Sequence, residues 1–506
     1  MLRFAFALLF LATTLAADVV YFAPSFTDPG RLERLTALFP EIDDLYRRHA
    51  TNEHLPGMVY GVMLDGRLVH TGTHGTANLI DNTAVHRATR FRIASMSKSF
   101  TAMAVLQLRD AGRLQLDDPV GKHIPQFRKV QPLTSDSPRI TLRHLLQMDV
   151  GFPQDDPWGD RKLADTIAQL EALAAGGLRF SNPPGTTWEY SNLGYGLLGH
   201  VVTRVSGRPY QEYITREILR PLGMTNTVWE YDRVPATDLA LGYRWEKDQW
   251  RPEPILHDGT FGAMGGLITT LDDFARYVAF HLDAWPPRDD SDTGPVRRAT
   301  RREMHSMHSF IGATYETNSP LAALVARGSG YGYGLATSLD SQNVFRVRHA
   351  GGLPGYGSEY RFVPDRGIAL IAFANRTYAP MTAINSRVLD FILNRANLPQ
   401  REIPVSPWLA RRSEQLVRIL REWPAADVTD ALAPNVFMDR DPADWQQLAR
   451  DQFKRIGQPV TIGAVRPLNQ LRGRIRVEGS TGKFDLFFTL TPEAVPRIQD
   501  IRFETL

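Results

Sequence analysis

Apolar and polar positions alternate with two periods in the first part of the chain. Apolar residues recur at helical spacing over residues 31–50, which predicts an amphipathic helix that Pro40 divides or kinks. Two strand-like runs, residues 58–64 and 67–70, flank Asp65-Gly66, a dipeptide typical of a tight hairpin turn. A sheet edge therefore forms early in the chain.

The middle of the chain follows a helical period. An apolar run begins directly after Phe91–Phe100 and predicts a buried helix that ends near Gly112. Further helices are expected at residues 141–146, 162–175 and 193–206. The pattern predicts an all-helical insert between regions of strand.

The strand period returns late. Residues 344–349, 359–363 and 368–374 predict three strands, and residues 384–395 predict a helix that follows them. With strands at both ends and helices between, we expect an α/β (α+β) fold with a mixed, mainly antiparallel sheet flanked by helices.

The length of the chain and the positions of its prolines indicate a division into domains. At 506 residues it exceeds one ordinary domain, and three prolines mark a linker over residues 399–407. We expect a main domain over residues 17–398 and a small α+β domain with an antiparallel sheet over residues 408–506. The latter is similar to the cone-shaped domains of the nuclear-transport-factor-like group.

The first 16 residues predict a secretory signal peptide. Arg3 precedes an apolar run from Phe4 to Leu15, and small residues follow. This run is too short for a membrane span, which needs about 20 residues, so we expect an exported protein, periplasmic or extracellular, without a stable span after signal cleavage. An uncleaved anchor is the alternative.

Composition excludes several kinds of chemistry. The chain has no cysteine, which rules out thiol catalysis, disulfides and cysteine-ligated metals. Its net charge is +3, and no basic run is interleaved with aromatic residues, so no nucleic-acid partner is expected. His305 and His308 have no third ligand nearby, and we expect neither metal nor cofactor.

One short run offers a nucleophile and a base. Ser95-Met96-Ser97-Lys98 opens the first helix of the insert, and residues three apart on a helix share a face. A buried lysine has a lowered pKa and can take a proton from serine. Taken alone, the pattern favours a helix cap followed by a surface lysine.

Two later motifs favour the chemical interpretation. Tyr190-Ser191-Asn192 precedes the helix at 193–206, and His349-Ala350-Gly351-Gly352 ends a strand. With Ser95 and Lys98, in this order, they resemble the class C-like branch of the serine β-lactamase and penicillin-binding protein superfamily. The resemblance covers about residues 45–395 and implies the β-lactamase/transpeptidase fold for that part.

The resemblance also implies roles. Ser95 would attack an acyl carbonyl, with Lys98 and Tyr190 as general base and acid. We expect the neighbouring lysine cation to lower the pKa of Tyr190. Asn192 would bind the lysine and the substrate, or cap the following helix, and His349 would orient a substrate carboxylate or assist proton transfer.

The family pattern also implies substrate contacts. The backbone N–H groups of Ser95 and Gly352 would form the oxyanion hole, and Gly351 and Gly352 would let the strand approach the substrate. Two departures concern specificity: His349 replaces the lysine of the lactamases, and Met148-Asp149-Val150-Gly151 replaces histidine-threonine-serine-glycine. Met148 and Gly151 are therefore candidate substrate-binding residues.

The sequence predicts an exported serine hydrolase that cleaves an amide or ester of a small-molecule or peptide substrate through a Ser95 acyl-enzyme. A D-alanyl-D-alanine carboxypeptidase or β-lactamase is the alternative. A non-catalytic peptidoglycan- or ligand-binding sensor is a third hypothesis. The oligomeric state and the role of residues 408–506 do not follow from the sequence.

Overall fold

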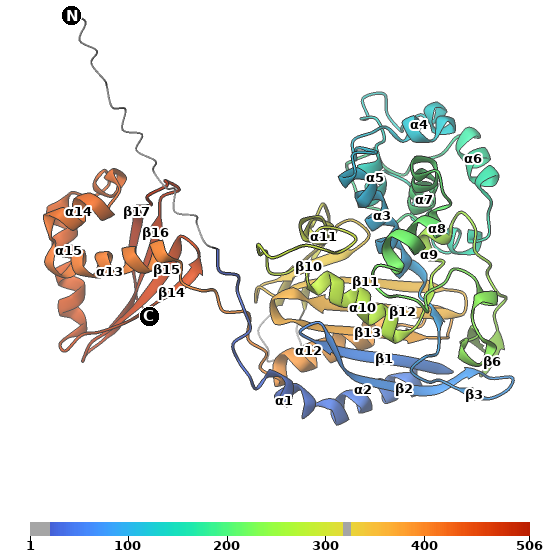
Figure 1. Cartoon of the computed structure of the whole chain (residues 1–506), viewed down its shortest axis with the longest axis horizontal. Helices are drawn as coiled ribbons and strands as arrows, with labels where there is room; N and C mark the ends of the chain where they lie inside the picture. Colours follow the sequence, from blue (N-terminus) through green and yellow to red (C-terminus); the bar gives the residue numbers. More distant parts are fainter. Residues whose placement is uncertain (1–20, 317–324, 506) are drawn as a thin grey trace, which may run out of the picture. The chain divides into compact units, whose positions relative to one another are not determined.

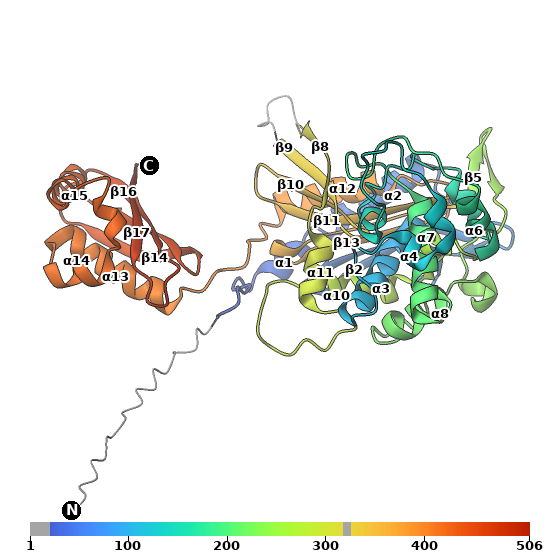
Figure 2. The same cartoon turned by 90° about the horizontal axis from the view of Figure 1, so that it is seen from above.

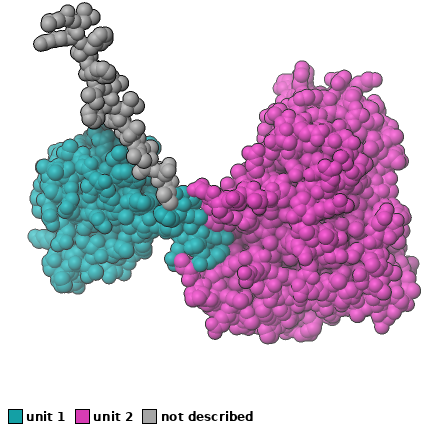
Figure 3. Space-filling model, viewed as in Figure 1, with its two compact units in different colours: residues 1–26, 401–506 teal, residues 27–400 magenta. Residues whose placement is uncertain are grey.

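The computed structural model describes residues 21–316 and 325–505. They form two compact units, residues 27–400 and residues 401–506 together with the stretch that ends at Phe26 (Figure 3). The predicted signal peptide lies outside the described residues. None of the helices described is both long enough and apolar enough to span a bilayer.

A nine-stranded sheet organises the first unit, in the order β3-β2-β1-β13-β12-β11-β10-β9-β8 (Figure 1). Its strands are β1 (Gly57–Leu64), β2 (Arg67–Asn78), β3 (Thr83–Ala84), β8 (Ser309–Glu316), β9 (Val325–Tyr331), β10 (Ala336–Asp340), β11 (Phe345–Leu353), β12 (Tyr356–Val363) and β13 (Ile368–Ala374). The fold class is confirmed, but the described pairings are all antiparallel rather than mixed.

The hairpin at Asp65-Gly66 is confirmed. Asp65 has φ +50° and Gly66 has φ +77°, the left-handed pair that a tight hairpin turn requires. The strand that follows late in the chain, β13, pairs with β1 in the centre of the sheet. Both strands are buried throughout, which explains their nearly continuous apolar sequences.

Helices cover both faces of this sheet. On one face, α1 (Arg31–Thr36), α2 (Phe39–Asn52) and α12 (Met381–Arg395) enclose a core of their own (Figure 1). The predicted helix over 31–50 is divided ahead of Pro40, which lies in the first turn of α2. On the other face, α10 (Leu271–Leu282) packs on β1 and β13.

The helical insert extends the second core. It contains α3 (Lys98–Asp110), α4 (Val120–His123), α5 (Leu142–Gln147), α6 (Ile167–Ala175), α7 (Asn192–Ser206), α8 (Tyr210–Ile214) and α9 (Gly262–Gly265). In Figure 2 these helices gather beside the sheet, and α11 (Arg298–His305) lies next to α10. The apolar side chains of the insert and of the sheet's face form one continuous core.

The second unit has a separate core. Its elements are α13 (Pro407–Glu422), α14 (Ala425–Ala431), α15 (Pro442–Ile456), β14 (Thr461–Asn469), β15 (Arg472–Glu478), β16 (Lys483–Leu490) and β17 (Ile498–Thr505). The four strands form an antiparallel sheet, as predicted, and they follow one another in sequence order. The likeness to cone-shaped domains stays a prediction.

Candidate active site

Ser95 lies in a 3-10 turn, Ala94–Ser97, that leads directly into α3. The turn follows β4 (Phe91–Arg92), which is anchored by its pairing with β7 (Ile268–Thr269). Ala94 has φ +49°, a left-handed conformation that costs a non-glycine residue energy and is found preferentially at functional sites. The strained turn places Ser95 at the helix entrance.

Glycine at position 351 brings β11 against this turn. A Cβ atom there would come within 2.2 Å of the Ile93 carbonyl oxygen and 2.3 Å of the Ser358 hydroxyl. Ser358 Oγ itself donates to the Ile93 carbonyl over 2.8 Å. Only a glycine lets strand and turn meet this closely, so the predicted role of Gly351 in close backbone approach has a structural basis.

Lys98 is fully buried and bonded on three sides. Its Nζ donates to Ser95 Oγ over 2.9 Å, to Asn192 Oδ1 over 2.6 Å and to the Met264 carbonyl over 3.1 Å. Three acceptors match the three protons of a charged amine. Lys98 is therefore a buried residue surrounded by partners, and the surface-lysine alternative is wrong.

Burial changes the acidity of this lysine. It lowers the pKa of Lys98 to about 8, because a charge is poorly solvated in the protein interior; Asp156, Asp160 and Asp155 partly offset the effect by attraction. An amine with such a pKa is substantially neutral just above neutral pH. Lys98 can then accept a proton from Ser95, to which it is already hydrogen-bonded.

Tyr190 also reaches the nucleophile. It lines the same cavity as Ser95, and the Lys98 ammonium lies 4.8 Å from the centre of its ring. Burial, reinforced by Asp156, raises the pKa of Tyr190 well above its ordinary value. The expected lowering by the lysine cation is wrong, because desolvation of the phenolate outweighs it. Tyr190 is a neutral phenol in this site.

Asn192 lies between Lys98 and a group of carboxylates. While its oxygen accepts from Lys98, its Nδ2 donates to Asp156 Oδ1 over 2.5 Å. It does not cap α7, since the Ser191 hydroxyl accepts the N–H of Gly194 in that position. Asn192 therefore contacts the lysine, one of its two expected roles.

His349 is buried at the cavity end of β11 with both ring nitrogens engaged. Nδ1 lies 2.6 Å from the Ala350 carbonyl oxygen and Nε2 lies 2.9 Å from the Tyr331 hydroxyl. Burial, together with repulsion from Lys98, lowers the pKa of His349 to about 3. In a neutral ring the carbonyl requires N–H on Nδ1, so Nε2 accepts from Tyr331. Neither nitrogen has a proton to offer a substrate carboxylate.

Met148 and Gly151 do not line the cavity. Met148 is buried with φ +59° at the end of α5, and Gly151 has φ +85°. Their carbonyl oxygens accept the N–H groups of Glu189 and Ser181, which fastens the loop to the segment that ends at Tyr190. The structure thus gives these two residues a role in holding that segment rather than the expected contact with substrate.

The site opens into a cavity of about 410 Å³. β10 pairs with β11 only up to Arg348, so the remainder of β11 faces the cavity along its free edge. The lining residues are Ser95, Asp156, Asp160, Trp188, Tyr190, Ile311, Tyr331, Ala336, Arg348, His349, Ala350, Gly351, Gly352, Tyr378 and Ala379. The cavity unites Ser95, Tyr190, His349, Gly351 and Gly352, all named from the sequence.

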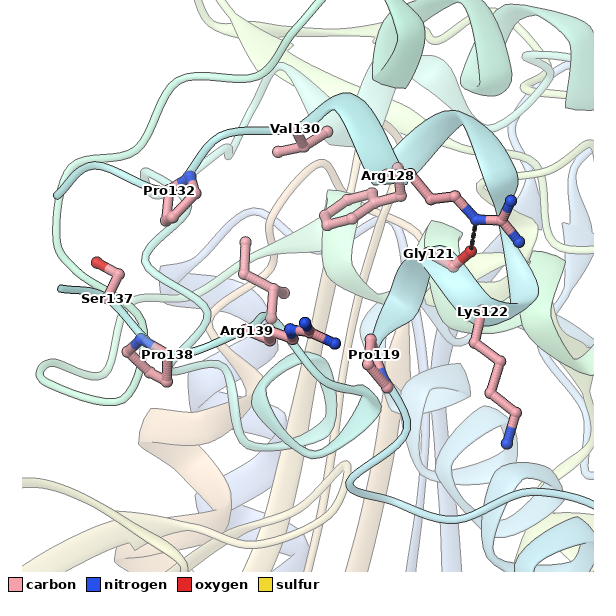
Figure 4. Close-up of a pocket in the computed structure, with 11 residues that line it drawn as sticks. Pro119, Gly121, Lys122, Arg128, Val130, Pro132, Ser137, Pro138 and Arg139 are labelled. Atoms are coloured by element: carbon pink, nitrogen blue, oxygen red, sulfur yellow. Dashed lines mark hydrogen bonds between the residues drawn. The ribbon is translucent and has the colours of Figure 1, made fainter. Parts of the chain in front are cut away.

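A larger cavity of about 520 Å³ lies between α4 and the segment that precedes α5 (Figure 4). Its serine, Ser137, is half-buried and hydrogen-bonded to Thr134. Its lysine, Lys122, is bound to Asp118 over 2.6 Å. Because no buried base meets a hydroxyl here, this cavity lacks the chemistry found at Ser95.

Sequence reasoning missed several residues of the site. Asp156 and Asp160 belong to the run Asp155–Asp160, in which three carboxylates within six residues are a signal that was available. Tyr331 and Tyr378 lie in segments far from the three motifs, and no local pattern marks them. They reach the cavity only through the tertiary fold, because β10 places β9 near β11 in the sheet and the Tyr378 N–H donates to the Leu353 carbonyl at the end of β11.

The fold and the site define the class of serine β-lactamases and penicillin-binding proteins. The chain belongs to the beta-lactamase family, whose model matches residues 42–393. Two solved structures share the fold. The octameric penicillin-binding protein homologue from Pyrococcus abyssi superposes with TM-score 0.60 and 23% identity over 92% of this chain and 93% of that one. The penicillin binding protein from Bacillus halodurans superposes with TM-score 0.54 and 21% identity over 68% of this chain and 99% of that one.

Two curated relatives are similar in sequence. Protein flp of Staphylococcus aureus is 27% identical over 358 residues, which are 69% of this chain and 66% of that protein. Beta-lactamase-like protein 2 of Dictyostelium discoideum is 26% identical over 421 residues, 79% of this chain and 72% of that protein. The chain thus spans just under two thirds of the first relative.

Proposed function

We propose that this protein is an exported serine hydrolase that cleaves an amide or ester through an acyl-enzyme on Ser95. One observation carries the proposal: the fully buried Nζ of Lys98 lies 2.9 Å from Ser95 Oγ. An isolated hydroxyl is a weak nucleophile, and an adjacent base with a lowered pKa is what activates it.

The contacts support a sequence of proton transfers. Neutral Lys98 takes the proton of Ser95 as Oγ forms a bond to the acyl carbon. Tyr190, a neutral phenol that shares the cavity with Ser95, can donate its proton to the leaving group and be reprotonated from Lys98. Water then cleaves the ester by the reverse route and regenerates Ser95. The backbone N–H groups of Ser95 and Gly352 remain our proposed oxyanion hole.

The cavity bears on the choice of substrate. The two engaged nitrogens of His349 offer no donor to a carboxylate. This favours a neutral ester or amide over the carboxylate-bearing substrates of a D-alanyl-D-alanine carboxypeptidase or a β-lactamase. For those two activities, Arg348 is the cation that the cavity offers instead.

Intact-mass measurement tests the proposal directly. The mature protein is incubated with a fluorophosphonate and, separately, with a fluorescent penicillin. We expect a fluorophosphonate adduct that disappears in Ser95→Ala and persists in Ser137→Ala, the matched serine of the larger cavity. An adduct that survives Ser95→Ala would contradict the mechanism. No adduct with either reagent would favour a non-catalytic binding protein, and a penicillin adduct would favour the carboxypeptidase alternative.

A further inference from the structure

Two carboxylates of one loop approach the catalytic lysine through a single amide. Asn192 Nδ2 donates to Asp156 Oδ1 over 2.5 Å and lies 3.4 Å from Asp160 Oδ1. On the other side of the amide, Oδ1 accepts from Lys98 over 2.6 Å. The carboxylates can accept but not donate when ionised, so they fix the amide with its oxygen toward the lysine.

The loop is built to approach this closely. A Cβ atom on Gly159 would lie 2.6 Å from the Cβ of Asn192, so the absence of a side chain brings the loop against the asparagine. Asp160 is almost fully buried, with 1% exposure, whereas Asp156 is exposed toward the cavity. Tyr378 OH donates to Asp160 Oδ2 over 2.8 Å from the other side.

Asp156 and Asp160 bring like charges together. Both carboxyl groups approach the same nitrogen, Asn192 Nδ2, so each lies in the field of the other. Burial, followed by the charge of Asp156, raises the pKa of Asp160 to about 7. Above that pH Asp160 is mostly ionised and adds a negative charge near the Lys98 cation; below it, Asp160 is mostly neutral.

We infer that Asp156 and Asp160 are positioning residues for Lys98: they orient Asn192 toward the lysine, and the charge on the pair sets the pH range over which Lys98 can act as a base. This inference rests on the proposed function. The pair's negative charge favours the ammonium form of Lys98, opposite to burial, so the two effects together set the pH of proton loss.

Other charged and titratable groups face the pair. Asp155 lies in the same loop, where its carboxylate accepts the N–H groups of Asn192 and Leu193, and Arg161 follows the pair in sequence. Tyr190, Arg348 and His349 share the cavity. The charges of Asp156, Asp160 and Asp155, all in this loop, raise the pKa of Lys98.

The pH dependence of fluorophosphonate labelling tests the inference. In the wild type we expect the second-order rate constant to rise through the pKa of Lys98. Asp160→Asn limits the pair to one charge, so Lys98 loses its proton more easily and the midpoint moves to lower pH by about half a unit or more. A structural defect alone would lower the rate without moving the midpoint.

Two further variants sharpen the test. Tyr378→Phe keeps every charge but removes a hydrogen bond that favours ionised Asp160, so the midpoint moves in the same direction by a smaller amount. Asp156→Ala removes the 2.5 Å acceptor of Asn192, and we expect a plateau rate about tenfold lower. Asp165→Asn is the matched control: it removes the same charge from the chain a few residues away, where the carboxylate pairs with Lys162.

The outcomes separate the two proposals. A wild-type protein that fluorophosphonate does not label contradicts the proposed function. A labelled wild type whose midpoint is unchanged in folded Asp160→Asn or Tyr378→Phe overturns the positioning role and leaves the proposed function intact. Folding of each variant is checked by circular dichroism and thermal unfolding.

Discussion

Arg348 is the cation of the active-site cavity that has no assigned partner. Among the described residues no hydrogen bond or ion pair holds its guanidinium, and the carboxylate of Glu359 is bound by Arg361 over 2.8 Å. Burial lowers the pKa of Arg348 although the charge of Glu359 acts in the opposite direction. A substrate anion that enters the cavity would pair with the charge of this guanidinium.

We therefore expect Arg348→Ala to distinguish anionic from neutral substrates. Loss of a charge-assisted hydrogen bond should slow acylation by penicillin, a carboxylate, about tenfold or more. Hydrolysis of a neutral p-nitrophenyl ester should change little, as should both activities in Arg139→Ala, an exposed arginine of the larger cavity. Equal losses with both substrates would show that Arg348 acts on the fold rather than on charge recognition.

At the scale of single residues, the sequence predicted the site residues that lie within its three motifs. Ser95, Lys98 and Asn192 meet because Ser95 lies in the turn that leads into α3, Lys98 begins α3, and Asn192 begins α7, which packs against α3. The acidity of Tyr190 was predicted wrongly, since burial depends on the whole fold and here exceeds the influence of one neighbouring charge. The engagement of His349 by Tyr331 is likewise a tertiary contact that no local pattern encodes.

The contact of β11 with the turn at Ser95 gives a prediction at the scale of elements. Gly351→Ala would place a Cβ atom 2.2 Å from a backbone oxygen, which cannot be relieved by a side-chain rotation. We expect the strand to move away from Ser95, with fluorophosphonate labelling reduced about a hundredfold or more and a lower melting temperature. Gly328→Ala in β9 is the control, because its nearest atom lies 4.0 Å away. Unimpaired labelling in Gly351→Ala would show that the site does not depend on this contact.

The packing of α10 on α11 predicts a pH dependence of stability. His281 Nδ1 lies 2.8 Å from His305 Nε2, and Trp285 Nε1 donates to His305 Nδ1 over 2.9 Å. Burial lowers the pKa of His305 to about 3 and that of His281 well below its ordinary value. The unfolded chain therefore binds more protons than the folded one below about pH 6.5.

The stability that these histidines contribute is present above about pH 6.5 and is lost as pH falls toward 3. Each adds about 1.4 kcal/mol per pH unit to the slope of unfolding free energy over this window. Urea unfolding of His305→Gln between pH 7.5 and 5 should show a slope smaller by up to that amount. His86→Gln, at a partly exposed position, serves as control. An unchanged slope in His305→Gln would contradict this account.

Helices and strands could be predicted where the sequence follows one clear period of apolar residues. The hairpin at Asp65-Gly66 and the strand 368–374 were confirmed because their patterns are unambiguous and the strand is buried on both faces. β8, β9 and β10 escaped prediction. They form one edge of the sheet, with exposed Phe310 and Tyr315 in β8 and repeated glycines in β9, so no alternation of buried and exposed residues marks them.

The molecule as a whole consists of two units whose hydrophobic cores have no residue in common. Every residue that lines the active-site cavity belongs to the unit 27–400. The structural likeness to the Pyrococcus abyssi homologue covers 92% of the chain and so extends beyond that unit. A core of its own is what allows a domain to fold independently.

Removal of residues 401–506 should therefore leave the catalytic unit intact. We expect a chain that ends at Gln400 to unfold cooperatively and to react with fluorophosphonate at a rate within about twofold of the full-length protein. Calorimetry and labelling kinetics measure both properties, and residues 401–506 produced separately should give their own unfolding transition. A labelling rate that falls tenfold in a folded truncated chain would show that the second unit contributes to the active site. The control is the same truncation carrying Ser95→Ala, in which no adduct should form.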